Sequence, residues 1–143
     1  MNFTLRPSTD TDLDFAAREL DAAGLPVSDL HAGHLAYTAM SAGAVVGVIG
    51  MEPYGSTGLL RSLVVSRGAR GSGVGRQLVE ALEGHAVSRG MHELWLLTID
   101  ADGWFGRHGY VVRDRRDAPP DIQGTAEFSG LCPGDAVLMS KKL

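Results

Sequence analysis

The segment Arg67 to Gly75 constrains the fold more than any other part of the chain, because four of its nine residues are glycines. A nearly continuous apolar run, Leu59 to Val65, precedes it, as expected of a central strand covered on both faces. Residues 73–89 then place apolar side chains three and four positions apart, which predicts an amphipathic helix. A second apolar run, Glu93 to Thr98, follows. The order strand, helix, strand predicts parallel pairing through a right-handed crossover.

The remaining segments predict a single mixed α/β domain that covers residues 1–143. A chain of this length suits one hydrophobic core, and no internal repeat or linker divides it. Hydrophobic periodicity and turn residues predict the other elements. Strands are expected at 2–6, 35–40, 44–51, 110–113 and 136–141, and helices at 9–23, 102–108 and 121–128, with a helical turn within 28–33.

Composition narrows the class of function. The net charge is −4 and no basic run stands out, which argues against a nucleic-acid partner, because such binding depends on neutralising phosphates. No apolar run reaches the roughly 18 residues of a membrane span, and Met1 to Pro7 lacks the features of a secretory signal. We therefore expect a cytoplasmic protein without a membrane partner.

Metal and thiol chemistry are also disfavoured. Cys132 is the only cysteine, so it has neither a disulfide partner within the chain nor a paired metal-ligand motif. No histidine is an obvious partner for it, and we interpret it as a small buried hydrophobe rather than a nucleophile. His31 and His34 are three positions apart, but no third ligand is apparent. We therefore expect no metal.

Three kinds of ligand site place glycines between a strand and a helix. The mononucleotide loop requires Lys and Ser/Thr after its last glycine, where this chain has Val74 and Gly75. The dinucleotide fingerprint requires a third glycine where Arg76 stands, and it belongs to an early strand–helix–strand unit. The third pattern is Arg/Gln-x-x-Gly-x-Gly/Ala at the start of a helix. Residues 70–75, Arg-Gly-Ser-Gly-Val-Gly, match it in full.

The third pattern suits a pyrophosphate. Small residues let backbone N–H groups converge on phosphate oxygens without a Cβ clash. The N-terminus of the following helix adds about half a positive charge. Arg70 and Arg76 flank the glycines and can add charge-assisted hydrogen bonds. The alternative is a structural turn with fortuitous glycines, which the flanking strand and amphipathic helix disfavour.

With these motifs the chain resembles the GNAT superfamily of acyl-CoA N-acyltransferases. The run Leu59 to Val65, the glycine loop, the helix ending at Gly90, the strand Glu93 to Thr98 and the aromatic segment Trp104 to Tyr110 follow the family's order. The resemblance implies the GNAT fold, a twisted mixed sheet of about six to seven strands, flanked by helices and splayed between strands 4 and 5. It also implies an N-acetyltransferase that uses acetyl-CoA as co-substrate and no metal.

The resemblance also implies where the coenzyme binds. Backbone N–H groups of strand 4 are expected to polarise the thioester carbonyl, so side-chain identity matters little there. Phe105 stands where the family often has a tyrosine that acts as general acid, so no acid is assigned. Either the thiolate leaves without a protein donor, or Tyr54 or Tyr110 substitutes. The expected coenzyme contacts are Leu63, Val64, Val65, Arg70, Gly71, Ser72, Gly73, Val74, Gly75, Arg76, Thr98 and Phe105.

Two stretches are similar to a narrower group, the N-acetyltransferases linked with bacterial arsenic resistance. They are Leu59 to Leu63 and the tail from Pro119 to Pro133. This similarity implies a small amino-acid-like acceptor that carries a carboxylate, with a toxic organoarsenic or phosphinic glutamate analogue as one candidate. The reaction would then be a detoxification by direct transfer. A homodimer is considered, because dimers are common among relatives.

Glu52 is the predicted general base. It follows the expected strand 44–51, where a carboxylate entering a half-buried cleft can accept the ammonium proton directly or through a water. The alternatives are a solvated turn residue, with ordered water as the base, and the carboxylates Asp100 and Asp102.

Arg61 and Ser62 are the predicted substrate contacts. A charged residue inside so apolar a strand is costly without a partner, and a substrate carboxylate held in a bidentate fork would be one. The alternative partner is Glu52 or another acid of the chain. Strand alternation would place Arg61, Leu63 and Val65 on one face.

Two rival functions remain open. The acceptor amine could belong to a peptide, a protein or a polyamine, although polyamine sites tend to be acidic and Arg61 counts against one. The chain could instead be a non-catalytic acyl-CoA sensor, which Phe105 in place of the usual tyrosine supports. A sensor would bind the coenzyme without turnover.

Overall fold

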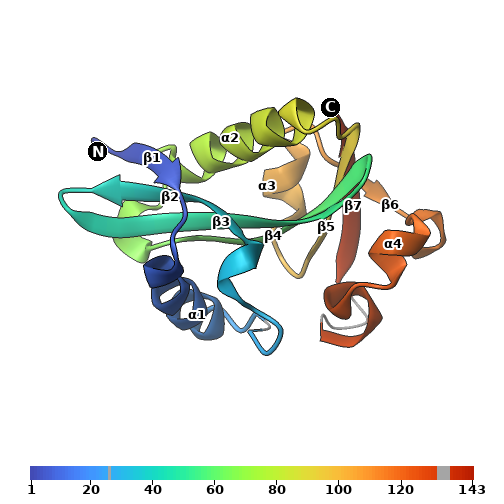
Figure 1. The fold of residues 1–143 in the computed structure, drawn as a ribbon, viewed down its shortest axis with the longest axis horizontal. Coiled ribbons are helices and arrows are strands. Elements are labelled where there is room, and N and C mark those ends of the chain that lie inside the picture. Colours follow the sequence, from blue (N-terminus) through green and yellow to red (C-terminus); the bar gives the residue numbers. More distant parts are fainter. Residues whose placement is uncertain (26, 132–135) are drawn as a thin grey trace. The chain divides into compact units, whose positions relative to one another are not determined.

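The computed structural model describes residues 1–25, 27–131 and 136–143. These residues form a mixed α/β fold (Figure 1). The strands are β1 Thr4–Pro7, β2 Leu35–Ser41, β3 Ala44–Tyr54, β4 Thr57–Val65, β5 Glu93–Thr98, β6 Val111–Arg113 and β7 Val137–Lys142. The helices are α1 Leu13–Ala22, α2 Val74–Ser88, α3 Asp102–Gly106 and α4 Pro120–Gln123, with 3₁₀ turns at Asp10–Asp12, Ala32–His34, Arg67–Ala69 and Arg115–Asp117.

The strands form a sheet in the order β1-β2-β3-β4-β5-β7-β6. Antiparallel ladders join β1 to β2, β2 to β3, β5 to β7 and β6 to β7. The ladder between β4 and β5 is parallel, which confirms the pairing predicted from the strand–helix–strand order. This ladder pairs Thr57, Gly58 and Leu59 of β4 with Glu93, Leu94 and Trp95 of β5. The splay expected between strands 4 and 5 stays a prediction.

The described chain divides into two compact units. The first unit comprises residues 1–51 and 61–85, and the second comprises residues 52–60 and 86–143. Strands β3 and β4 each contribute residues to both units. The prediction of one domain over residues 1–143 stays a prediction.

Each unit has a hydrophobic core of its own. The first core is formed by Ala16, Leu20, Val48 and Val64. The second core is formed by Leu59, Trp95, Ala118, Ile122 and Leu138. In α2, Leu78, Leu82 and Ala86 are fully buried, which confirms the apolar face predicted for this helix.

The tail helix is shorter than predicted. α4 ends at Gln123, and a separate π-helical turn spans Glu127–Leu131. The Thr125 hydroxyl donates to the carbonyl of Ile122 at 2.7 Å and accepts from the backbone N–H of Phe128 at 3.2 Å. A side chain that bonds nearby backbone groups competes with helical hydrogen bonds. The predicted helix 121–128 is therefore interrupted at residues 124 and 125.

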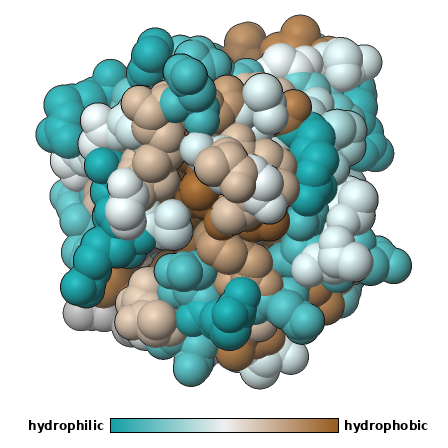
Figure 2. All heavy atoms as spheres, turned by 90° about the vertical axis from the view of Figure 1, so that its left-hand side faces the viewer, coloured by the Kyte–Doolittle hydropathy of each residue, from teal (hydrophilic) through white to brown (hydrophobic). Residues whose placement is uncertain are grey.

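One hollow on the surface of the first unit contains no group for acid–base chemistry. Figure 2 shows a face on which hydrophobic side chains reach the surface near the centre, among hydrophilic ones. In the first unit, residues 2–4 and 40–43 line a shallow hollow, and none of these lining residues is titratable. Among the described residues, no helix combines the length and the apolar character needed to cross a membrane.

A buried carboxylate ties β1 to α1 and β2. Asp12 is 1% exposed and accepts hydrogen bonds from the Arg6 guanidinium at 2.8 and 2.9 Å. It also accepts from the backbone N–H of Thr9 and from the hydroxyl of Thr38, each at 2.8 Å. These partners, the Arg6 hydrogen bonds above all, lower the pKa of Asp12 to about 2. The buried charge is therefore compensated from three segments of the chain.

We expect Asp12→Asn to destabilise the folded protein at neutral pH. Because folding lowers the pKa of Asp12 from 3.8 to about 2, its contribution is present above pH 3.8 and is lost as the pH falls toward 2. The free energy of unfolding of Asp12→Asn should be lower by on the order of 2 kcal/mol at neutral pH and should fall less on acidification. Urea unfolding at neutral and acidic pH measures both effects.

Asp114→Asn is the matched control for this prediction. The hydrogen bonds from Arg116 lower the pKa of Asp114 to about 2 as well, but both side chains of this pair are exposed to solvent. An exposed ion pair contributes little to stability. Asp114→Asn should therefore unfold like the wild type at neutral pH. If the free energy of unfolding of Asp12→Asn fell as steeply on acidification as that of the wild type, the stabilising role of Asp12 would be contradicted.

Candidate active site

The glycine loop leads from β4 into α2. The 3₁₀ turn Arg67–Ala69 follows β4, and α2 begins at Val74, one residue later than predicted. Gly71 and Gly73 have φ angles of 81° and 89°, a left-handed conformation that favours glycine. The first N–H groups of any α-helix lack intrahelical acceptors, so this end of α2 can donate to an anion.

Two arginines flank this loop. Arg70 is exposed, and its Nε donates to the carbonyl of Val65 at 3.2 Å. The Arg76 side chain is 54% exposed, and its Nη1 lies 3.5 Å from Oε1 of Glu80 in the next turn of α2. Exposed guanidinium groups beside a helix N-terminus can donate charge-assisted hydrogen bonds to a phosphorylated ligand.

Buried contacts hold the loop in place. The Ser72 hydroxyl donates to the carbonyl of Ala69, and Val74 is 1% exposed. A Cβ added at Gly47 of β3 would lie 3.1 Å from side-chain atoms of Val74 and Leu78. Since that contact is tighter than an ordinary one, glycine at position 47 lets α2 pack closely on β3.

Strand β4 does not keep the expected alternation. Ser62 has a φ of 60°, in the left-handed region that non-glycine residues rarely adopt. Arg61 and Val64 are buried, whereas Leu63 and Val65 are only half-buried. The expected common face of Arg61, Leu63 and Val65 is therefore corrected, because the turn at Ser62 interrupts the two-residue period.

Arg61 forms a buried ion pair with Asp29. Its two terminal nitrogens donate to the two Asp29 carboxylate oxygens at 2.7 and 2.9 Å, and its Nε donates to the Ser62 hydroxyl at 3.2 Å. The Arg61 side chain is 0% exposed and that of Asp29 is 21% exposed. The hydrogen bonds from Arg61, with a smaller effect of His34, hold the pKa of Asp29 below its usual range. The sequence left the acidic partner of Arg61 open, and Asp29 is one such partner in the structure.

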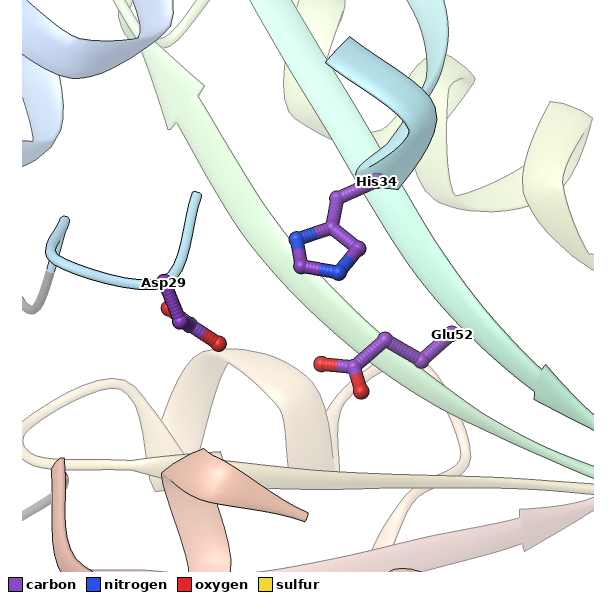
Figure 3. A group of neighbouring side chains, drawn as sticks. All are labelled: Asp29, His34 and Glu52. Atoms are coloured by element: carbon purple, nitrogen blue, oxygen red, sulfur yellow. The ribbon is translucent and has the colours of Figure 1, made fainter. Parts of the chain in front are cut away.

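His34 lies beside Asp29 in the first unit. The two side chains, drawn in Figure 3 together with Glu52, offer ligand atoms within 4.8 Å of one another. A Cβ at Gly50 would lie 2.1 Å from the His34 carbonyl oxygen, so β3 approaches this turn more closely than any other residue type allows. His34 and Asp29 are thus held against β3 and β4.

Glu52 and Tyr54 lie at the end of β3, in the second unit. The Tyr54 hydroxyl donates to Glu52 Oε1 at 2.6 Å, and both residues are half-buried. The Tyr54 ring packs against the core around Leu59 and Trp95. Tyr54 therefore orients the carboxylate that sequence analysis predicts as the general base.

Thr98 and Phe105 occupy structural positions in the second unit. Thr98 is buried, and its hydroxyl accepts from the backbone N–H of Ala101 at 3.0 Å, before α3 begins. Phe105 is 6% exposed and meets the buried Tyr110 edge to face at 5.6 Å between ring centroids. Their predicted coenzyme contacts stay predictions. Asp100 and Asp102, the alternative bases, are exposed, and Cys132 lies outside the described residues.

Sequence reasoning did not find Asp29 or the contact between Tyr54 and Glu52. The second had a signal, because residues two apart on a strand share a face. Asp29 had none, since it lies in an irregular turn far in sequence from its partner Arg61.

The chain is similar to known proteins in sequence and in fold. Over 81 residues, 55% of the chain, the sequence is 30% identical to an amino-acid acetyltransferase of Ralstonia nicotianae, of which it covers 18%. The fold is similar to that of N-acetylglutamate synthase from Neisseria gonorrhoeae, solved with coenzyme A and N-acetyl-glutamate. That likeness has a TM-score of 0.84 at 17% identity and covers 100% of this chain and 35% of that one.

A second solved structure matches over almost its entire length. It is that of Rv2747 from Mycobacterium tuberculosis, in complex with CoA and NLQ, with a TM-score of 0.81, 19% identity and coverage of 98% of this chain and 99% of that one. At such identities the structures show the fold. The sequence model of the acetyltransferase (GNAT) family matches residues 4–110, well over half of the chain. This protein therefore belongs to the GNAT acetyltransferase family.

Proposed function

We propose that this chain transfers an acetyl group from acetyl-CoA to the amine of a small amino-acid-like molecule. The observation that carries the proposal is the left-handed backbone at Gly71 and Gly73, which leads directly into the N-terminus of α2. This arrangement offers N–H groups and a helix dipole to a pyrophosphate, the group that coenzyme A carries. Arg70 and Arg76 add positive charge beside it.

The transfer needs no covalent enzyme intermediate. Glu52, oriented by Tyr54, accepts a proton from the acceptor ammonium, directly or through water. The amine nitrogen then attacks the thioester carbon while backbone N–H groups of residues 63–65 polarise its carbonyl. A carbon–nitrogen bond forms, the carbon–sulfur bond breaks, and the coenzyme thiolate takes up the second proton that the nitrogen releases. Thr98 and Phe105 complete the proposed coenzyme contacts.

A carboxylate on the acceptor is the second part of the proposal. The Ralstonia relative is an amino-acid acetyltransferase, and the Neisseria structure contains N-acetyl-glutamate. Proteins similar to this chain therefore act on an amino acid or bind an acetylated one. The chain spans under a fifth of the first and about a third of the second. Arg61 and Ser62 are the proposed contacts for that carboxylate. The similarity of residues 59–63 and 119–133 to the arsenic-resistance enzymes adds an organoarsenic or phosphinic glutamate analogue as a candidate acceptor.

One observation favours a rival function. Phe105 is buried against Tyr110 and cannot donate a proton, whereas the family often has a tyrosine there. A non-catalytic acyl-CoA sensor needs no acid, so it fits this replacement. Acetylation of a peptide or protein amine is the other alternative within the family.

Free-thiol release from acetyl-CoA tests the proposed function. We expect release with one acidic amino acid in a panel of glutamate, phosphinic and arsenic-containing glutamate analogues, a polyamine and a short peptide. Glu52→Gln should lower kcat by about 100-fold or more, because it removes the base but keeps the shape. Tight coenzyme binding without release for any amine would favour the sensor.

Coenzyme affinity tests the role of the glycine loop. We expect Gly73→Ala to weaken coenzyme A binding about tenfold, because its φ of 89° is strained for any side chain. No atom lies within 4 Å of a Cβ at this position, so the loss would come from backbone strain. Gly68→Ala is the matched control: it has equal space and no left-handed φ. Isothermal titration calorimetry measures both, and equal affinities of the two variants would count against the loop.

Turnover tests the orienting role of Tyr54. Tyr54→Phe removes the donor to Glu52 and keeps the ring in the core, so we expect kcat to fall about tenfold. The affinity for coenzyme A should be unchanged. Tyr37 is a half-buried residue of β2, and Tyr37→Phe serves as the control because it also removes one hydroxyl. A wild-type kcat in Tyr54→Phe would show that Glu52 needs no orientation.

A further inference from the structure

The guanidinium of Arg61 is enclosed by protein. Its side chain is 0% exposed, it holds Asp29 through both terminal nitrogens, and its Nε donates to Ser62. A buried guanidinium cannot lose its charge, and leaving it without an anion is strongly unfavourable. A carboxylate bound to this guanidinium is therefore strongly favoured in the folded chain.

Asp29 is the accessible half of this pair. Its side chain is 21% exposed, whereas Arg61 has no exposed side-chain surface. It lies in a turn between α1 and β2, outside the regular elements, where a side-chain rotation costs no sheet or helix hydrogen bond. Of the two charged groups, Asp29 is therefore the one that a solute can contact.

We propose that Asp29 occupies the acceptor's carboxylate site in the ligand-free protein, and that the acceptor binds by exchanging its own carboxylate for that of Asp29 on Arg61. This inference rests on the proposed function and deepens it. The exchange replaces one planar carboxylate by another in the same fork, so Arg61 keeps two charge-assisted hydrogen bonds throughout. The bound state therefore avoids the large cost of leaving the buried charge without a carboxylate.

Exchange makes Asp29 a specificity-determining residue. An amine without a carboxylate cannot replace Asp29 on Arg61, so the site discriminates amino acids from polyamines by competition with an internal anion. The same competition weakens the apparent affinity for the correct acceptor by the fraction of time that Asp29 leaves the fork. Asp29 stays a competitor near neutral pH, because Arg61 holds its pKa below the usual range.

Rescue by acetate tests the exchange without coenzyme or turnover. Asp29→Ala removes the Asp29 carboxylate from Arg61 and should lower the Tm by about 10 °C or more. Sodium acetate should restore about half of this loss or more, and sodium chloride at equal ionic strength should not. The double variant Asp29→Ala with Arg61→Met, which removes both charges, should show no acetate response. Equal effects of acetate and chloride would overturn the proposal.

Asp12→Ala is the matched control. It removes the carboxylate of the Arg6–Asp12 pair, which has the same bidentate form, with distances of 2.8 and 2.9 Å. That pair ties elements of the fold together and is not proposed to bind a ligand, so acetate should leave its Tm unchanged. Rescue of both variants to the same extent would show a general anion effect and contradict a site at Arg61.

Asp29→Asn provides a second measurement, which also serves if the alanine variant does not fold. It keeps the side-chain volume and one acceptor oxygen but removes the competing charge. If Asp29 fills the fork nine-tenths of the time, this variant should bind L-glutamate about tenfold tighter than the wild type, measured calorimetrically with coenzyme A present. Equal, weaker or undetectable binding would overturn the exchange and leave Asp29 a structural partner of Arg61.

The two proposals fail in different ways. Absence of thiol release with every amine of the panel would count against the proposed function alone, because acetate rescue requires no reaction. Normal turnover combined with an Asp29→Asn variant that binds L-glutamate less tightly would retain the acetyltransferase and reject the exchange.

Discussion

A backbone cradle for phosphate requires a chain that reverses sharply between a strand and a helix, and the rest of this site depends on that reversal. Gly71 and Gly73 provide it with φ angles of 81° and 89°. Glycine is entropically costly to order, so the reversal must be held by its surroundings. Val74 is buried directly after it, and Gly47 lets α2 pack closely on β3. Burial of the α2 face, through Leu78 and Leu82, offsets the cost of ordering the loop.

A second constraint is the charge inside β4. Arg61 interrupts an apolar strand, and the Asp29 carboxylate binds its guanidinium through both oxygens. Ser62 has a left-handed φ of 60°, and its hydroxyl accepts a hydrogen bond from Arg61 Nε at 3.2 Å. Strained non-glycine residues of this kind persist where their surroundings hold them. A buried ion pair adds little stability compared with apolar packing. The proposed exchange of carboxylates gives this pair a role in binding.

Patterns carried by neighbouring residues were predicted well. The parallel β4–β5 pair, the buried face of α2 and the position of the glycine loop all follow from periodicity and glycine spacing. Features set by a single side chain were missed. The hydroxyl of Thr125 ends the tail helix early, and Ser62 breaks the alternation of β4, because in each case a local conformation overrides the average preference of the segment.

By itself, the sequence determined the class of fold, the family and the place of the glycine loop, because these depend on residues within a few positions of one another. Only the tertiary structure decided which acid meets Arg61 and which donor meets Glu52. Asp29 and Arg61 are 32 positions apart, and no periodicity links a residue in an irregular turn to one in a strand. Such a pair forms because burial of the surrounding apolar side chains brings both segments together and leaves the guanidinium no water to replace its partner.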